Sequence, residues 1–298
     1  MVQTIRKQKV LHDVQKARRT RTIISIVVIA IIAAGVLGGI LLIRPTPPSP
    51  LIGVQISATT QNQLAGVSGS TLVQIGHTGA TPLTSETGTL LTNGGLPEVL
   101  YVGADYCPYC AAERWSMIVA LEKFGNFTSL TYMQSADAPE IYPDTSTFSF
   151  HNAHYTSSYI SFVGVETYDR NKQPLDTISP AQQTILNQYD SGGAIPFLDV
   201  ANKAVTYNGG SQYQPPAITG LDWNTIGSQL NNPSSGIAKA VDAAANTIIT
   251  AICNVDGSVP SSICGLTLSP PLNLPPATDN MQSSNLLNSL IATDAYDL

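Results

Sequence analysis

The fold of this 298-residue chain is decided by residues 97–110, which read Pro97-Glu98-Val99-Leu100-Tyr101-Val102-Gly103-Ala104-Asp105-Tyr106-Cys107-Pro108-Tyr109-Cys110. The apolar run at 97–104 predicts a buried strand. Residues 111–124 predict a helix that buries Trp115, Ile118, Val119 and Leu121. Gly125 is placed to end that helix as a left-handed cap. Residues 128–133 then predict another strand.

The two cysteines of this stretch stand at the start of the predicted helix. Cys107 would occupy the N-cap and Pro108 the first helical position, where a missing N–H costs nothing. Unpaired N–H groups and the helix dipole favour a negative sulfur, so Cys107 is the predicted nucleophile. Cys110 lies one turn deeper, placed to close a disulfide or to resolve a mixed one. A structural disulfide and a zinc half-site are alternative interpretations, although Cys253 and Cys264 match a second zinc half-site poorly and no metal is expected.

A second group of elements follows further along the chain. Ser179-Pro180 precedes a predicted short helix at 181–189, and Ile195-Pro196 precedes a strand-like run that ends at Val200. The turn Asn208-Gly209-Gly210 is predicted to close a hairpin with residues 204–207. A helix is predicted at 222–230.

Residues 97–230 resemble a thioredoxin-fold oxidoreductase in this order of elements. The resemblance implies that Ile195-Pro196 is a cis-proline element facing the two cysteines, and that Ile195, Pro196 and Tyr109 bind substrate. An ordinary edge proline is the alternative for Pro196. The dipeptide Pro108-Tyr109 is similar to glutaredoxins. Tyr101 stands where thioredoxins often carry a buried acid.

A wider likeness covers roughly residues 70–264. The runs at 103–115, 147–151, 159–162, 164–167 and 195–197 are similar to the family catalogued as domain of unknown function 929, which is found largely in archaea and has no established activity. The resemblance strengthens the expected fold class, an α/β, thioredoxin-like sheet with flanking helices and a long insertion.

The N-terminal part predicts a membrane anchor. Residues 22–43 read TIISIVVIAIIAAGVLGGILLI, without charge and long enough to cross a bilayer as one helix. A cleaved signal peptide and a buried soluble helix are the alternatives. The basic residues at 1–21 predict a cytoplasmic tail that touches anionic lipid. The proline-rich residues 44–50 predict a linker, and everything after it would lie outside the membrane.

Charge is divided unevenly along the chain. The net charge of −6 combines eight basic residues and only Asp13 in residues 1–44 with six basic and 19 acidic residues in 45–298. The acidic excess makes nucleic acid an unlikely partner, because phosphate binding needs clustered Lys and Arg. Charged residues are only 11% of the chain, a composition that suits an acidic environment in which carboxylates protonate.

The remaining segments carry weaker signals. Residues 51–96 predict a lead-in region with short strands at 53–57 and 71–75. Residues 134–190 predict an insertion, either an aromatic lid over the cysteines or a packed subdomain, with the aromatic residues Tyr142, Phe148, Phe150, Tyr155, Tyr159, Phe162 and Tyr168. A long helix, capped by Ser234 or Ser235, would end at Cys253, and residues 265–298 form a tail. Cys253 and Cys264 are predicted to form a structural disulfide, or alternatively a second redox centre.

Together these features predict a membrane-anchored thiol–disulfide oxidoreductase acting outside the cell, in oxidation or isomerisation, with no cofactor. Its expected partners are protein thiols and disulfides, the lipid bilayer through residues 22–43 and a membrane redox protein. The alternative is a non-catalytic surface domain in which the disulfide between Cys107 and Cys110 is only a staple.

Overall fold

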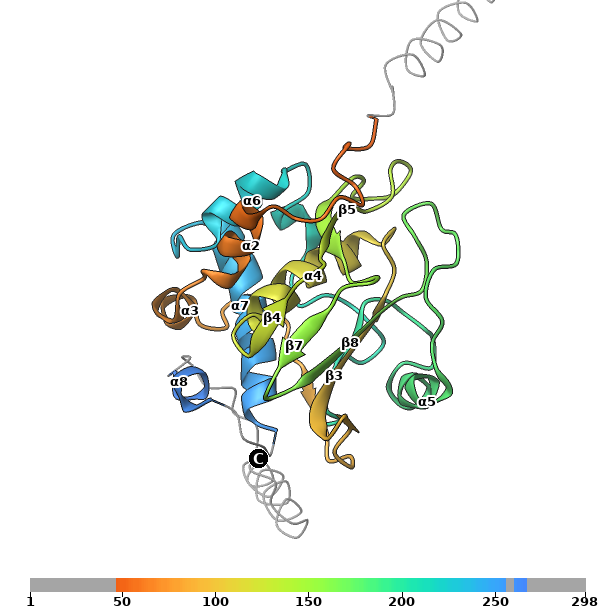
Figure 1. Ribbon diagram of the computed structural model, residues 1–298, viewed down its shortest axis with the longest axis vertical. Helices are drawn as coiled ribbons and strands as arrows, with labels where there is room; N and C mark the ends of the chain where they lie inside the picture. Colours follow the sequence, from red (N-terminus) through yellow and green to blue (C-terminus); the bar gives the residue numbers. More distant parts are fainter. Residues whose placement is uncertain (1–46, 256–259, 267–298) are drawn as a thin grey trace, which may run out of the picture. The chain divides into compact units, whose positions relative to one another are not determined.

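The central element of the protein is strand β3 (Leu96–Gly103), which a computed structural model places inside a six-stranded sheet (Figure 1). The structure describes residues 47–255 and 260–266, and from Pro48 on the described chain belongs to one compact unit. The predicted cytoplasmic tail, the membrane anchor at 22–43, the first residues of the linker and nearly all of the C-terminal tail lie outside the described residues.

Both neighbours of β3 come from later in the chain. Strand β8 (Ser161–Glu166) runs parallel to β3, with Glu98 opposite Ser161. On the other side, β9 (Phe197–Val200) runs antiparallel, and β10 (Ala204–Val205) and β1 (Thr84–Ser85) continue the sheet to its edge. The short β2 (Thr92–Asn93) pairs with the start of β3. The order β1-β10-β9-β3-β8 makes β3 an interior strand.

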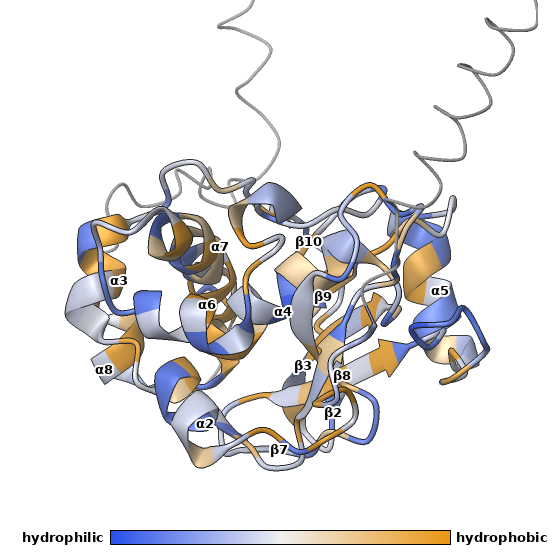
Figure 2. Cartoon of the chain, turned by 90° about the horizontal axis from the view of Figure 1, so that it is seen from above, coloured by the Kyte–Doolittle hydropathy of each residue, from blue (hydrophilic) through white to orange (hydrophobic). Residues whose placement is uncertain are grey.

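Helices cover both faces of this sheet. Helices α4 (Pro108–Leu121) and α7 (Gly236–Cys253) lie on one side, and α5 (Pro180–Tyr189) lies on the other (Figures 1 and 2). Val99 and Tyr101 join the core beneath α4 and α7, whereas Leu100 and Val102 join a second core beneath α5. Successive side chains of a strand point to opposite faces, so a strand covered on both faces is apolar throughout.

The other elements surround this three-layered arrangement. They are the helices α2 (Ala58–Ala65), α3 (Gly69–Ile75), α6 (Trp223–Gln229) and α8 (Ser261–Cys264), the 3₁₀ turn η1 (Pro215–Ala217), and two small antiparallel sheets, β4 (Gly125–Phe127) with β7 (Tyr155–Ser157) and β5 (Thr131–Gln134) with β6 (Ser146–Ser149). Helices α5, α6 and α7 lie where the sequence predicts helices, with Ser235 as the N-cap of α7.

The two strands predicted in the lead-in region are wrong. Residues 71–75 belong to helix α3, and residues 53–57 are irregular and lead into α2. The side chains of Ser57 and Ser68 accept hydrogen bonds from the backbone N–H groups of Thr60 and Thr71, and so cap the two helices. Serine caps and the burial of an apolar side chain in each helix override the weak strand propensity of these residues.

Helix α4 ends earlier than the sequence predicts. Its last residue is Leu121, and Gly125 starts strand β4 instead of capping the helix. The side chain of Glu122 accepts a hydrogen bond from the Phe127 backbone N–H at 3.0 Å, which helps to hold a tight turn between the two elements. This side-chain contact stabilises the turn where a glycine cap was expected.

Part of the segment 134–190, predicted as an insertion, belongs to the main sheet. Strand β8 from this segment is the parallel neighbour of β3, and α5 covers one face. The strand predicted at 128–133 corresponds to β5, which pairs with β6 in a separate sheet. Strand periodicity identifies a strand but does not specify its partner, and a parallel partner is always reached by a long crossover.

The turn of the β9–β10 hairpin also differs from the prediction. It lies at residues 201–203, where Ala201 and Asn202 adopt φ values of 55° and 58°. The Asp199 carboxylate accepts the Asn202 N–H at 3.1 Å and holds this turn. The predicted turn at 208–210 instead follows β10, and Gly210 N–H donates to the Pro196 carbonyl at 2.9 Å.

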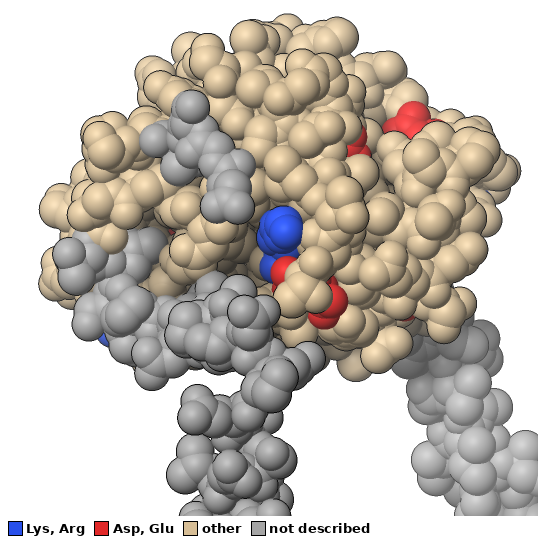
Figure 3. All heavy atoms as spheres, turned by 90° about the horizontal axis from the view of Figure 1, so that it is seen from below, with Lys and Arg blue, Asp and Glu red and all other residues tan. Residues whose placement is uncertain are grey.

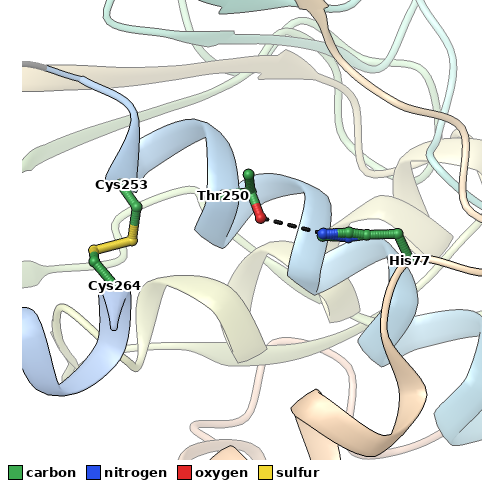
Figure 4. The surroundings of a disulfide bond; sticks show 4 residues. All are labelled: His77, Thr250, Cys253 and Cys264. Carbon is green, nitrogen blue, oxygen red and sulfur yellow. Dashed lines mark hydrogen bonds between the residues drawn. A yellow bond between two sulfur atoms is a disulfide. The ribbon is translucent and has the colours of Figure 1, made fainter. Parts of the chain in front are cut away.

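Helix α7 is a long apolar helix that packs in the main core. Among the described residues it is the one helix long and apolar enough to cross a membrane, and 67% of it is buried within the protein, as in a core helix. Its Asn246 amide donates to the carbonyls of Leu72 and Gly76. Its last residue, Cys253, lies at disulfide distance from Cys264, as the sequence predicts, and one turn earlier Thr250 contacts His77 (Figure 4).

Candidate functional site

The thiol pair lies where strand β3 passes into helix α4. Cys107 is the N-cap residue, with extended backbone angles, and Pro108 is the first helical residue. The Cys107 sulfur accepts a hydrogen bond from the Cys110 backbone N–H at 3.3 Å. Both cysteines are free thiols; Cys107 is 6% exposed and Cys110 is fully buried. The local geometry is the one that the sequence predicts for a nucleophile at a helix N-terminus.

The surroundings of the two sulfurs shift their pKa values in opposite directions. The hydrogen bond with the Cys110 side chain is the main cause that lowers the pKa of Cys107 below its ordinary value, and backbone N–H groups and the Arg114 charge act in the same direction against the effect of burial. Burial, the hydrogen bond with Cys107 and the Cys107 charge raise the pKa of Cys110 well above its ordinary value. These shifts favour the anionic form at Cys107 and the protonated form at Cys110.

The loop before β9 lies beside Cys107. The Ile195–Pro196 peptide bond is cis, and the Ile195 carbonyl oxygen is 3.9 Å from the Cys107 sulfur, within reach of a weak S–H hydrogen bond. Pro196 is buried, and its carbonyl already accepts the Gly210 N–H. The half-buried Ile195 is therefore the residue of this loop whose carbonyl oxygen faces the Cys107 sulfur.

Two aromatic side chains next to the cysteines in the sequence each contact a second ring. Tyr109 is half-buried and meets Tyr142 edge to face at 6.0 Å between ring centroids, and Tyr106 meets the exposed Tyr168 at 6.3 Å. Tyr142 and Tyr168 come from the aromatic-rich segment 134–190, so this segment contacts the residues next to the two cysteines.

Other aromatic residues of the same segment pack inside the protein. Phe148 lies against Trp115 at 4.6 Å between ring centroids, and Phe150 lies against Tyr101 at 5.0 Å. Tyr155 and Phe162 join the cluster around Phe127. For these residues the segment is packed into the protein, as the subdomain interpretation expects.

A buried ionic cluster that the sequence reasoning missed lies behind the thiol pair. The Arg114 guanidinium donates to both carboxylate oxygens of Glu166, at 2.8 and 2.6 Å, and to the Ala104 carbonyl at 2.8 Å. Asp105 is 3.6 Å from the same guanidinium. Arg114 and Glu166 are fully buried, and Asp105 is 1% exposed. The missed signal is the position of Arg114, seven residues after Cys107 and thus two helical turns along the same face.

This cluster contains one cation and two acids. Burial, followed by the Glu166 charge, raises the pKa of Asp105 to about 7. With Asp105 protonated the cluster is neutral, and with Asp105 ionised it carries one net negative charge. The Arg114 charge lowers the pKa of both thiols, so this buried cation connects the cluster to the cysteines electrostatically.

Two further side chains anchor Glu166 from outside. The Asp176 carboxylate accepts the Glu166 backbone N–H at 3.0 Å, and its other oxygen lies 2.7 Å from His151 Nδ1. In the described part of the chain no three His, Cys, Asp or Glu side chains gather as a metal site. His151 acts here as a hydrogen-bonding partner of Asp176.

Comparison with known proteins gives one match. Residues 86–195 are similar to a family described as a domain of unknown function (DUF929), which supports the resemblance noted from the sequence over that range. The matched range includes Cys107, Cys110 and Ile195. No curated protein and no solved structure matches the chain.

Proposed function

We propose that this protein is a membrane-anchored thiol–disulfide oxidoreductase of thioredoxin-like fold that acts outside the cell on proteins. The observation that carries the proposal is the position of the Cys107 sulfur. It lies 3.3 Å from the Cys110 backbone N–H at the start of α4 and 3.9 Å from the Ile195 carbonyl of a distant loop. The first contact favours the anionic form of this sulfur, and the second marks adjacent backbone that an extended peptide can approach.

The sheet supports the thioredoxin-like part of the proposal. Its core has the order β10-β9-β3-β8, with β8 parallel to β3 and the hairpin β9–β10 antiparallel to it. The chain reaches these strands in the order strand, helix, parallel strand, helix, hairpin, helix. This is the order in which the resemblance places the cysteines at the start of the first helix and the proline before the hairpin.

The reaction proceeds through a mixed disulfide. The Cys107 thiolate attacks a substrate disulfide, forms a Cys107–substrate disulfide and releases one substrate thiolate, which takes up a proton. Cys110 then loses its proton and attacks Cys107. The second substrate thiolate leaves, so the substrate is reduced and the pair becomes a disulfide. In the reverse direction the Cys107–Cys110 disulfide oxidises a dithiol, and an exterior location favours that direction or isomerisation.

The predicted partners follow from the same proposal. Residues 22–43 would hold the domain at the bilayer, and a membrane redox protein would restore the oxidised pair. Nucleic acid is not proposed as a partner, because residues 45–298 hold 19 acidic and six basic residues. The face shown in Figure 3 agrees, since Lys and Arg are sparse among its described residues.

A trapping experiment tests the proposal. A Cys110→Ser protein cannot resolve the mixed disulfide, so it should accumulate covalent adducts with unfolded, disulfide-containing proteins. Mass spectrometry should map the adducts to Cys107. The matched control, Cys107→Ser, should form none. Absence of adducts from Cys110→Ser with several such substrates would refute the proposal.

The burial of both thiols favours a second candidate, a non-catalytic binding domain. Cys107 is only 6% exposed and Cys110 is fully buried, as expected for an inert staple. In that case the reduction potential of the pair should be that of a structural disulfide, and Cys107 should resist alkylation in the reduced protein.

A further inference from the structure

A cavity of about 470 Å³ opens beside the loop that carries Ile195. Asp190 and residues 193–195 contribute to one wall, and residues 167–168, 174 and 176–178 contribute to another. Val102 and Leu186 complete the apolar part of the lining. This volume is within the range of small-ligand and side-chain pockets. Gly193 is exposed in the first wall, and no neighbouring atom lies within 4 Å of a Cβ built on it.

Both walls of the cavity are tied to the thiol pair. Ile195 lines the cavity, and its carbonyl is 3.9 Å from the Cys107 sulfur. On the other wall, the Tyr168 carbonyl accepts the Asp105 backbone N–H at 2.9 Å, two residues before Cys107. A polypeptide that reacts at Cys107 therefore passes next to this cavity.

Asp190 is the unexplained residue of the lining. It is 2% exposed, and neither of its carboxylate oxygens has a hydrogen-bond partner. The other acid of the lining, Asp176, is already paired with His151, and the lining contains no Lys, Arg or His. A buried carboxylate without a partner is costly, and native proteins rarely leave one unsatisfied. The Asp190 carboxylate thus lacks a hydrogen-bond donor, and the lining supplies no positive charge to pair with it.

We propose that this cavity is a substrate subsite for a basic side chain, Lys or Arg, close to the reacting cysteine of the substrate polypeptide, with Asp190 as the anionic partner. The inference rests on the proposed function and deepens it, because it names the class of polypeptide that exchanges fastest. The apolar residues Val102, Ile178 and Leu186 would contact the methylene stem, and the carboxylate would bind the charged end.

The test uses disulfide-bonded peptides that differ only at the positions flanking the cysteine, with Lys, norleucine or Glu there. The wild-type protein should exchange fastest with the Lys peptides. Asp190→Asn, which keeps the shape of the side chain, should slow the Lys peptides roughly tenfold and leave the norleucine peptides unchanged, as expected for loss of one charge-assisted hydrogen bond. Asp137→Asn removes an exposed carboxylate outside the cavity and is the matched control.

A second variant guards against misfolding of Asp190→Asn. Thr177 is exposed and lines the cavity, so Thr177→Lys adds a positive charge at its rim and should also reduce the preference for Lys peptides. A circular dichroism melt verifies the fold of each variant. Equal exchange rates for all three peptide types, unaffected by either variant, would overturn the subsite and leave the oxidoreductase intact.

A binding arm separates the two proposals. Fluorescently labelled peptides with Ser in place of Cys cannot exchange, and their binding is measured by anisotropy. The Lys peptide should bind more tightly than the norleucine peptide to the wild type but not to Asp190→Asn. If this difference is found while no peptide exchanges, the subsite stands and the proposed reaction fails. If neither a binding nor a rate difference is found, the subsite is wrong.

Discussion

The two cysteine pairs of this protein lie at opposite ends of two helices that pack on the same face of the sheet. Cys107 caps the N-terminus of α4, whereas Cys253 is the last residue of α7. Unpaired N–H groups at a helix N-terminus stabilise a thiolate, and unpaired carbonyls at a C-terminus destabilise one. The first pair is a pair of free thiols, and the second lies at disulfide distance.

The two pairs also differ in burial and in the charges near them. The first pair is buried beside the fully buried Arg114, whose charge lowers the pKa of both thiols. The second pair is half-buried, and Figure 4 shows the polar contact of His77 with Thr250 one helical turn away. The comparison teaches that the position of a cysteine on its helix, and not cysteine spacing alone, distinguishes the pair proposed to exchange disulfides from the pair at disulfide distance.

The largest predicted difference between the pairs is in activity. Cys107→Ala should reduce the rate of refolding of a scrambled disulfide protein to the uncatalysed rate, because the nucleophile is lost. The double variant Cys253→Ala, Cys264→Ala should keep the full rate at a temperature where it is folded. Loss of activity in the double variant alone would reverse the assigned roles.

Removal of the buried cation should have the next largest effect. Arg114→Met leaves Glu166 buried without its partner, which should destabilise the protein by roughly 3–5 kcal/mol. The same change should raise the pKa of Cys107. Urea denaturation and the pH dependence of alkylation measure the two effects.

Arg114→Lys is the matched control, because it keeps the positive charge and loses only the bidentate hydrogen bonding to Glu166. It should preserve more of the stability than Arg114→Met. If Arg114→Met leaves the pKa of Cys107 unchanged, the ionic cluster has no electrostatic role at the thiols.

The sequence was sufficient for the parts of this site that are local. The N-cap at Cys107, the proline at the first helical position and the short reach to Cys110 depend on neighbouring residues, and the structure shows each of them. Helices α5 and α7 were likewise predicted, because serine caps and apolar periodicity are local signals.

The parts that were missed depend on residues far apart in the sequence. Arg114 and Glu166 are 52 residues apart, and neither has a local signature of pairing. The strand partner of β3 was missed for the same reason, since β8 is reached only after two small sheets. In the lead-in region, side-chain capping by Ser57 and Ser68 outweighed strand propensity.

Loss of the second pair should change stability and not chemistry. Replacing Cys253 and Cys264 with Ala should lower the free energy of unfolding by about 3 kcal/mol, because the cross-link constrains the unfolded chain. The disulfide closes a sequence separation of 11 residues. Chemical denaturation measures the difference; an unchanged free energy of unfolding would show that the bond stabilises nothing.

A last predicted effect, which does not involve the cysteine pairs, is the pH dependence of stability. Burial is the main cause that raises the pKa of Asp199 to about 7, and of Glu113 and Asp242 to about 8. These acids bind protons more tightly in the folded state, so their contribution is complete below the unfolded pKa of about 4 and is lost as pH rises through 7 to 8. Each group changes stability by at most about 1.4 kcal/mol per pH unit.

The denaturation midpoint in urea should therefore be higher at pH 5 than at pH 8. Neither carboxylate oxygen of Asp242 has a hydrogen-bond partner, so Asp242→Asn should reduce the difference between the two pH values without removing a hydrogen bond. A midpoint that rises from pH 5 to pH 8 would contradict the assigned protonation of these groups.

The pKa of Cys107 tests the central claim most directly. Mass spectrometry follows alkylation of Cys107 and Cys110 separately across pH in the reduced protein, with the Cys253–Cys264 disulfide intact. We predict that Cys107 titrates below the ordinary thiol value of about 8.5 and that Cys110 titrates above it. Equal titration of the two thiols, at or above that value, would contradict the account.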